Sequence, residues 1–247
     1  MGLEMEELAT VLPMEAAASA AREQGVEIYP LSRYYFGAKD APRAVETPAD
    51  RALRLKANFA AHGLRTSVHG VLLVLPAFFS ISAVQFPTVE LFDHPHVLLL
   101  QVRNSSFVLP GGRLRPGEED VQGLKRKLSS KLSVVSDGEG ATGDVDDWQV
   151  GECIGMWWRS EFGAVPFPYM PPSFRTPKCL NSLCCFKECI KLFLIRLPMS
   201  RRFVVPRNMK LLAVPLSQIH GNAQVYGPII SGIPNLLSKF SFNVITD

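Results

Sequence analysis

The amino-acid sequence predicts a single α/β domain, with a mixed β-sheet sandwiched between α-helices and an N-terminal extension. Apolar runs of strand length alternate with segments whose apolar residues recur every three or four positions. The chain has 247 residues, of which 47% are apolar and 20% charged, so it can bury a large core. A glycine-rich turn near its centre leads directly into an amphipathic helix. We assign residues 1–25 to a flexible tail and residues 26–247 to the domain.

The first part of the domain is expected to be extended and then helical. Residues 28–36 are rich in aromatic side chains and predict an extended segment. A helix is predicted between Thr47 as N-cap and Gly63 just past its end, with Pro48 at the first helical position. Leu55 and Phe59, then Leu53 and Ala57, give it apolar positions four residues apart.

Strands and loops follow in alternation. The predicted strands are residues 68–75, 96–102, 148–158, 190–197 and 209–214. The segment 76–95 between the first two is too long for a hairpin and predicts an inserted loop. Residues 136–147 are acidic and glycine-rich and predict a flexible loop, and residues 234–240 begin a terminal helix.

Composition and charge limit the classes of partner. The net charge of +3 permits a polyanionic partner without requiring one. The N-terminus is acidic where a signal peptide would be basic, and prolines and polar residues interrupt the uncharged stretch 70–89. We therefore expect a soluble intracellular protein with no membrane partner.

Four cysteines lie close together but do not have the spacing of a metal site. They are Cys179, Cys184, Cys185 and Cys189. A zinc site usually shows two C-x2-C pairs, or one such pair with matching histidines. We expect free thiols here, no metal and no cofactor.

The central turn and helix carry the most specific motif. From Leu109 to Val134 the chain reads L-P-G-G-R-L-R-P-G-E-E-D-V-Q-G-L-K-R-K-L-S-S-K-L-S-V. The Nudix box of Mg²⁺-dependent pyrophosphohydrolases reads G-x5-E-x7-R-E-U-x-E-E-x-G-U, where U is a bulky apolar residue. Residues 111–134 resemble this box, with matches in register at Gly112, Glu118, Arg126, Leu128 and Val134. The Nudix fold is the expectation that follows.

The metal-binding chemistry of the box is missing. Lys127, Ser130 and Lys131 stand where the motif has its three core glutamates. Mg²⁺ needs hard oxygen ligands, and two ammonium groups four residues apart on one helix face oppose a divalent cation. We expect no Nudix hydrolysis and no catalytic residue.

A closer resemblance covers residues 28–242. It rests on these blocks, in order: Y-P-L-S-R-Y-Y-F-G from Tyr29, H-V-L-L-L-Q from His96, L-P-G-G from Leu109, G-L-K-R from Gly123, C-I-G-M-W-W-R from Cys153, K-L-F-L from Lys191, V-P-R-N-M-K-L from Val205 and Y-G-P-I-I-S from Tyr226. Together they resemble the small, Nudix-fold subunit of cleavage factor I in pre-mRNA 3′-end processing. Blocks such as C-I-G-x-W-W-R are not general Nudix features.

The resemblance implies a nuclear, homodimeric and catalytically silent protein. It implies binding of single-stranded RNA at short U- and G-containing elements, such as U-G-U-A, in the pre-mRNA 3′ UTR. It also implies contacts with a larger, RRM-containing subunit and with the polyadenylation machinery.

The family's RNA-binding positions can be transferred residue by residue. They fall on Arg51, Ser105, Ser106, Phe107, Leu109, Tyr226 and Gly227. Single-stranded RNA is read by aromatic stacking and by hydrogen bonds to base edges, which an arginine, a phenylalanine and a tyrosine can supply. From the residues alone, Arg51 also fits a solvated surface charge, Tyr226 a turn-packing ring and Phe107 a core ring.

The chain departs from the family pattern at three positions. Ser106 precedes Phe107 where the family has two adjacent aromatic residues, so one stacking ring is absent. His69 and Gly163 stand where the family has acidic residues. We expect RNA binding to survive these changes and the preference for U-G-U-A to change.

Two other functions stay open at this point. One is a Nudix hydrolase of a diphosphate-linked nucleotide with relocated acids, for which Glu118, Glu119 and Asp120 are the candidates. The other is a protein-interaction module that has lost RNA contact.

Overall fold

The computed structural model describes residues 25–40, 47–76, 94–102, 106–133, 148–168 and 186–245. Three predicted segments lie wholly or largely outside these ranges: the tail 1–25, the insert 76–95 and the acidic loop 136–147. Ser105 lies outside them as well. In the part of the chain that is described, no helix is long and apolar enough to cross a bilayer.

A mixed sheet of eight strands forms the centre, in the order β11–β4–β3–β9–β7–β8, with β5 beside β4 and β6 beside β3. These strands are β3 (Arg65–Val74), β4 (His96–Val102), β5 (Ser106–Val108), β6 (Gly111–Arg113), β7 (Gln149–Arg159), β8 (Phe167–Pro168), β9 (Glu188–Arg196) and β11 (Met209–Pro215). β3 and β9 are parallel, while β3 pairs with β4 and with β6 in antiparallel fashion. The predicted mixed sheet is confirmed, and so are the predicted strands to within three residues at their ends.

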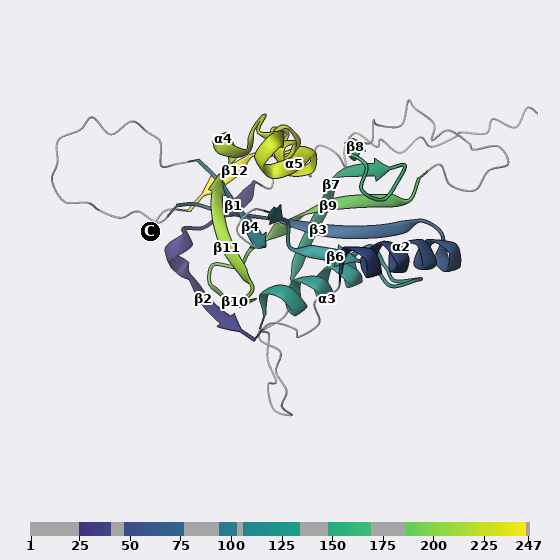
Figure 1. Cartoon of the computed structure of the whole chain (residues 1–247). Coiled ribbons are helices and arrows are strands. Elements are labelled where there is room, and N and C mark those ends of the chain that lie inside the picture. The colour runs from purple at the N-terminus through teal and green to yellow at the C-terminus, as the bar shows by residue number, and fades with distance from the viewer. Residues whose placement is uncertain are drawn as a thin grey trace, which may run out of the picture.

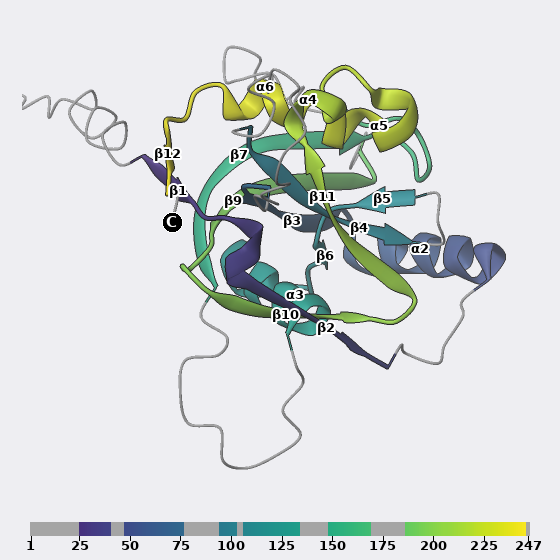
Figure 2. The same ribbon diagram turned by 90° about the vertical axis from the view of Figure 1, so that its left-hand side faces the viewer.

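Both faces of the sheet are covered. Along β3, Val71 and Leu73 pack into one core cluster and Leu72 and Val74 into the other, as the alternation of side chains along a strand requires. One face is covered by α4 (Leu216–Ile219), α5 (Ala223–Ser231) and α6 (Ile233–Leu237), and the other by α3 (Asp120–Leu132) (Figures 1 and 2). The predicted sandwich of a sheet between helices is confirmed.

The helix of the degenerate box is amphipathic, as predicted. Leu124, Leu128 and Leu132 of α3 are fully buried, and Gly123 is buried beside them. Burying these leucines against the sheet stabilises the fold by about 1.5–3 kcal/mol for each side chain. Because the apolar stripe is independent of the metal-binding face, the helix keeps its position without the glutamates of the motif.

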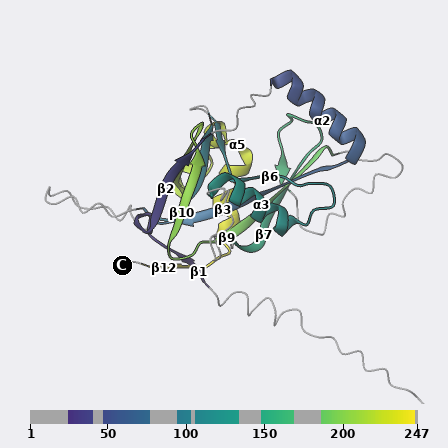
Figure 3. The same ribbon diagram turned by 90° about the horizontal axis from the view of Figure 1, so that it is seen from below.

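The helix predicted between Thr47 and Gly63 forms as α2 (Pro48–His62). The Thr47 hydroxyl accepts a hydrogen bond from the Asp50 backbone N–H at 3.1 Å, and Gly63 ends the helix at φ 70°. None of the described side chains of α2 is fully buried: Leu55 and Phe59 are half-buried, and Leu53 is 67% exposed. α2 lies at the periphery of the molecule (Figure 3).

The ends of the domain differ from the sequence-based expectation. The extended segment 28–36 is three elements: β1 (Val26–Ile28), a 3-10 turn at Leu31–Arg33, and β2 (Tyr34–Lys39). β2 pairs in parallel with β10 (Arg201–Pro206), and β1 pairs in parallel with β12 (Phe242–Val244). The sequence predicted neither β10 nor β12, since short strands far apart in the chain depend on each other for pairing.

Truncating Leu128 tests the role of the α3 stripe. We expect Leu128→Ala to lower the free energy of unfolding by about 2–5 kcal/mol, because it leaves a cavity in a closed core. Chemical denaturation measures the change, and Ser130→Ala on the exposed face of the same helix is the control. A loss below about 0.5 kcal/mol at Leu128 would contradict the packing.

Candidate nucleic-acid interface

Two lysines occupy the helix face on which a Nudix enzyme holds its metal. Cδ and Cε of Lys127 lie 3.3 Å from the position that a Cβ on Gly112 would take. Lys131 lines the same pocket as Gly111 and Gly112. Burial lowers the pKa of both lysines, and the positive charge of Lys127 lowers the pKa of Lys131 further. This face therefore presents ammonium groups instead of carboxylate oxygens.

Two of the three remaining acids of the box are bound by basic groups. Glu118 accepts hydrogen bonds from Arg126 Nε at 2.6 Å, from Arg126 Nη2 at 2.5 Å and from the Arg115 backbone N–H at 2.7 Å. The Arg126 guanidinium, helped by that N–H, lowers the pKa of Glu118 to about 2. Asp120 pairs with Lys191 of β9, and Glu119 points to solvent as the N-cap of α3. Glu118 and Asp120, two of the relocated acids considered above, are thus each paired with a basic side chain.

Nothing in the described part of the chain gathers a metal-binding set. No group of three or more His, Cys, Asp or Glu side chains suited to a metal ion occurs there. Cys189 is a buried free thiol in β9, and burial raises its pKa to about 11. Cys179, Cys184 and Cys185 lie outside the described residues.

A pocket of about 400 Å³, which we call the central pocket, lies next to the face of α3 that carries Lys131. Five of the seven transferred RNA-binding positions line it: Arg51, Phe107, Leu109, Tyr226 and Gly227. Ser106 is exposed at the start of β5 and is not part of the wall. The fold therefore brings together residues from α2, the β5 region and α5 that are up to 176 positions apart in the chain.

Two aromatic rings form one wall of the central pocket. The rings of Phe107 and Tyr226 lie with centroids 4.9 Å apart and planes at 47°. Tyr226 is only 6% exposed, whereas Phe107 is half-buried. Gly227 breaks α5 at φ 79°, a conformation that favours glycine, so that the chain turns at the pocket rim. Tyr226 thus supports Phe107 from behind, and Phe107 is the ring more accessible to a ligand.

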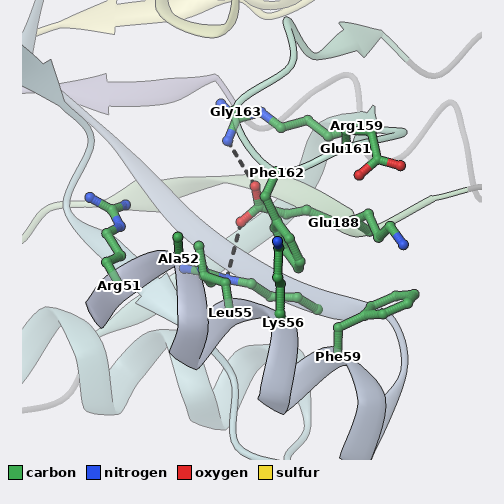
Figure 4. A pocket seen from close by; sticks show the side chains of 12 residues that line it. Arg51, Ala52, Leu55, Lys56, Phe59, Arg159, Glu161, Phe162, Gly163 and Glu188 are labelled. Carbon is green, nitrogen blue, oxygen red and sulfur yellow. Dashed lines mark hydrogen bonds and ion pairs between the residues drawn. The ribbon is translucent and has the colours of Figure 1, made fainter. Parts of the chain in front are cut away.

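An ion-paired cluster forms the opposite wall. Glu188 of β9 is 5% exposed and accepts hydrogen bonds from Arg159 Nη1 at 2.8 Å and from the Ser67 hydroxyl at 3.1 Å. Arg65 Nε lies 3.2 Å from Glu188 Oε1, close enough for an ion pair but without the alignment of a hydrogen bond (Figure 4). Burial lowers the pKa of Arg65, and Glu188 offsets part of this shift. Arg51 is exposed beside this cluster.

His69 of β3 lies on the floor of the central pocket. Its Nδ1 lies 3.3 Å from the Leu109 carbonyl oxygen, which only accepts hydrogen bonds. Nδ1 therefore carries the proton in this contact, and Nε2 of the neutral ring is an acceptor. Burial lowers the pKa of His69 to about 4, so the ring is neutral near pH 7.

Sequence patterns missed part of this pocket. Arg65, Ser67, Arg159 and Glu188 meet only because β3, β7 and β9 are adjacent in the sheet. One signal was available: Glu188 and Arg159 are charged residues at the ends of segments that otherwise predict buried strands.

The pKa of His69 has a consequence for stability. Between pH 6.5 and about 4 the unfolded chain binds a proton at this residue that the folded chain does not, so stability falls as the pH falls through this window. We expect NMR titration to give His69 a pKa near 4, and the drop in Tm from pH 7 to pH 5 to be smaller in His69→Gln. An ordinary histidine pKa of about 6.5 would contradict the burial.

Comparison with known proteins gives two results. The model of the Nudix family described as "Nucleotide hydrolase" matches residues 24–240. The chain is 57% identical over 221 residues to pre-mRNA cleavage factor Im 25 kDa subunit 1 of Arabidopsis thaliana, covering 89% of this chain and 86% of that protein. It is 44% identical to subunit 2 of the same plant, covering 92% and 99%.

A third relative comes from a distant organism. Cleavage and polyadenylation specificity factor subunit 5 of Dictyostelium discoideum is 36% identical, over 85% of this chain and 90% of its own. With lysines on the former metal face, and with these relatives matched over most of their length, the chain belongs to the Nudix family and, within it, to the 25 kDa subunits of pre-mRNA cleavage factor Im.

Proposed function

We propose that the protein is a non-catalytic, RNA-binding subunit of the pre-mRNA cleavage and polyadenylation machinery. It binds short U- and G-containing elements of the 3′ UTR in single-stranded form and recruits a larger, RRM-containing subunit. It acts in the nucleus and as a homodimer. The names of its relatives support a role in the cleavage and polyadenylation of pre-mRNA.

The observation that supports RNA binding is the composition of the central pocket. The half-buried Phe107 ring, backed by Tyr226, offers a surface for base stacking, which is worth about 1–3 kcal/mol per base. Arg51 at the rim can pair with a base edge or a phosphate. Lys131 adds positive charge at the back of the pocket.

The preference of the central pocket for particular bases depends on which of its groups can accept or donate hydrogen bonds. Nε2 of His69 accepts a hydrogen bond but has no negative charge, unlike the carboxylate of the family pattern. Ser106 adds no second stacking ring. Recognition of U-G-U-A is therefore weakened or retuned while binding of unstacked bases is retained.

Replacing Arg51 tests the pocket. We expect Arg51→Ala to weaken binding to a U-G-U-A-containing oligonucleotide about tenfold, through the loss of a paired guanidinium, with no change in Tm. Fluorescence anisotropy measures the affinity. Arg54→Ala on the same helix, outside the central pocket, is the control. Equal affinities of Arg51→Ala and wild type would remove Arg51 from the site.

The competing hydrolase function is tested by turnover. We expect no Mg²⁺-dependent hydrolysis of a dinucleoside polyphosphate above background, because Lys127 and Lys131 oppose the metal and Glu118 is paired with Arg126. A competent Nudix enzyme assayed in parallel is the control. Turnover that is lost in Glu118→Gln would establish catalysis instead.

A module that binds only proteins is the other alternative, which the missing ring at Ser106 favours. It predicts partner binding without crosslinking to U-rich RNA.

A further inference from the structure

A second recess, of about 620 Å³, lies between α2 and the loop that follows β7. We call it the side recess. Arg51, Lys56 and Phe59 of α2 line one side, and Glu161, Phe162 and Gly163 line the other (Figure 4). It shares four residues with the central pocket: Arg51, Arg65, Arg159 and Glu188. The two hollows are therefore neighbours across a common wall.

The side recess explains the exposed helix α2. Arg51, Leu55 and Phe59 are spaced four residues apart and lie on one stripe of the helix. In most surface helices such a stripe packs against the core. Here Leu55 and Phe59 are only half-buried because they face this recess.

The lining of the side recess is positively charged. Arg65 and Arg159 are engaged by the buried Glu188. Beyond this cluster, Arg51, Lys56 and Lys187 face a single exposed carboxylate, that of Glu161. Such a surplus attracts a polyanion.

Aromatic rings line the same space. Phe59 and Phe162 meet edge to face, with centroids 6.1 Å apart and planes at 85°. Lys187 Nζ lies 4.2 Å from the centroid of Phe59, in a cation–π contact. Cations next to accessible rings are the combination that binds single-stranded nucleic acid, in which phosphates meet the charges and bases stack on the rings.

We propose that the side recess binds nucleotides that flank the element held in the central pocket, on the same RNA strand. Arg51 stands at the shared rim, Lys56 pairs with a flanking phosphate, and Phe162 stacks on a flanking base. RNA is favoured over an acidic protein segment because Arg51 lines both the recess and the central pocket, and because the recess has an aromatic wall. This inference rests on the RNA-binding function proposed above.

The length of the RNA tests the proposal in the full-length protein. The probes are the U-G-U-A tetranucleotide and oligonucleotides that extend it by several uridines on the 5′ or the 3′ side. We expect only one of the two extensions to raise the affinity. The side on which that extension lies shows the direction in which the strand runs from the central pocket to the side recess. Equal affinity for the tetranucleotide and for both extended probes would overturn the side recess and leave the central pocket standing. Failure of every probe to bind would overturn both.

Substitutions in the side recess test whether the gain in affinity for the extended probe arises there. We expect Phe162→Ala to reduce the affinity for the extended probe about tenfold, Phe162→Tyr to retain it, and neither to affect the tetranucleotide. Lys56→Ala should make the log–log salt dependence shallower by about 0.7 for the extended probe only. Controls are Leu53→Ala, which is on α2 but outside the recess, and Lys210→Ala, a matched charge change on β11.

Two results would contradict the assignment. If Lys56→Ala weakens the short and the extended probe equally, the charge acts at a distance and not in the recess. If the Phe162 and Lys56 variants keep the whole gain in affinity of the extended probe over the tetranucleotide, the flanking nucleotides bind elsewhere. An acidic protein segment is then the ligand that fits the recess.

Discussion

The buried carboxylate of Glu188 is the constraint on which the arrangement of the central pocket and the side recess depends. A buried charge is costly unless it is paired and hydrogen-bonded. Here Ser67 of β3 and Arg159 of β7 donate hydrogen bonds to Glu188, and Arg65 of β3 adds an ion pair. These contacts hold two arginines at the ends of the two strands that flank β9. The resulting wall separates the central pocket from the side recess and belongs to both. Removing the carboxylate would leave two like charges next to each other without a counterion.

The box helix keeps its place in the fold without the three core glutamates of the motif. The position of α3 depends on three buried leucines, and the Glu118–Arg126 pair ties the preceding loop to the helix. Neither feature needs a metal. The face toward the pocket carries Lys127 and Lys131, whose ammonium groups oppose a divalent cation. Glu118 keeps its place in the motif with a structural contact in place of a catalytic one.

Much of the fold could be predicted from the sequence because local signals were strong. The cap at Thr47, the stop at Gly63 and the leucine stripe of α3 each have a local physical cause, and each is observed. Strands β10 and β12 were missed because their partners are β2 and β1, more than a hundred residues away. The apolar positions of α2 indicate a face of the helix but not what that face meets.

The sequence by itself determined the fold class, the family and the absence of metal ligands at the box, because these depend on residue identity at fixed spacing. It also named Arg51, Phe107, Tyr226 and Gly227 as residues of one site. Only the tertiary structure decided that Tyr226 lies behind Phe107, that His69 is a neutral acceptor at the pocket floor, and that a second recess runs beside α2. The exposure of a ring, the tautomer of His69 and the wall shared by the two hollows all depend on which strands become neighbours. Long-range pairing in the sheet decides this.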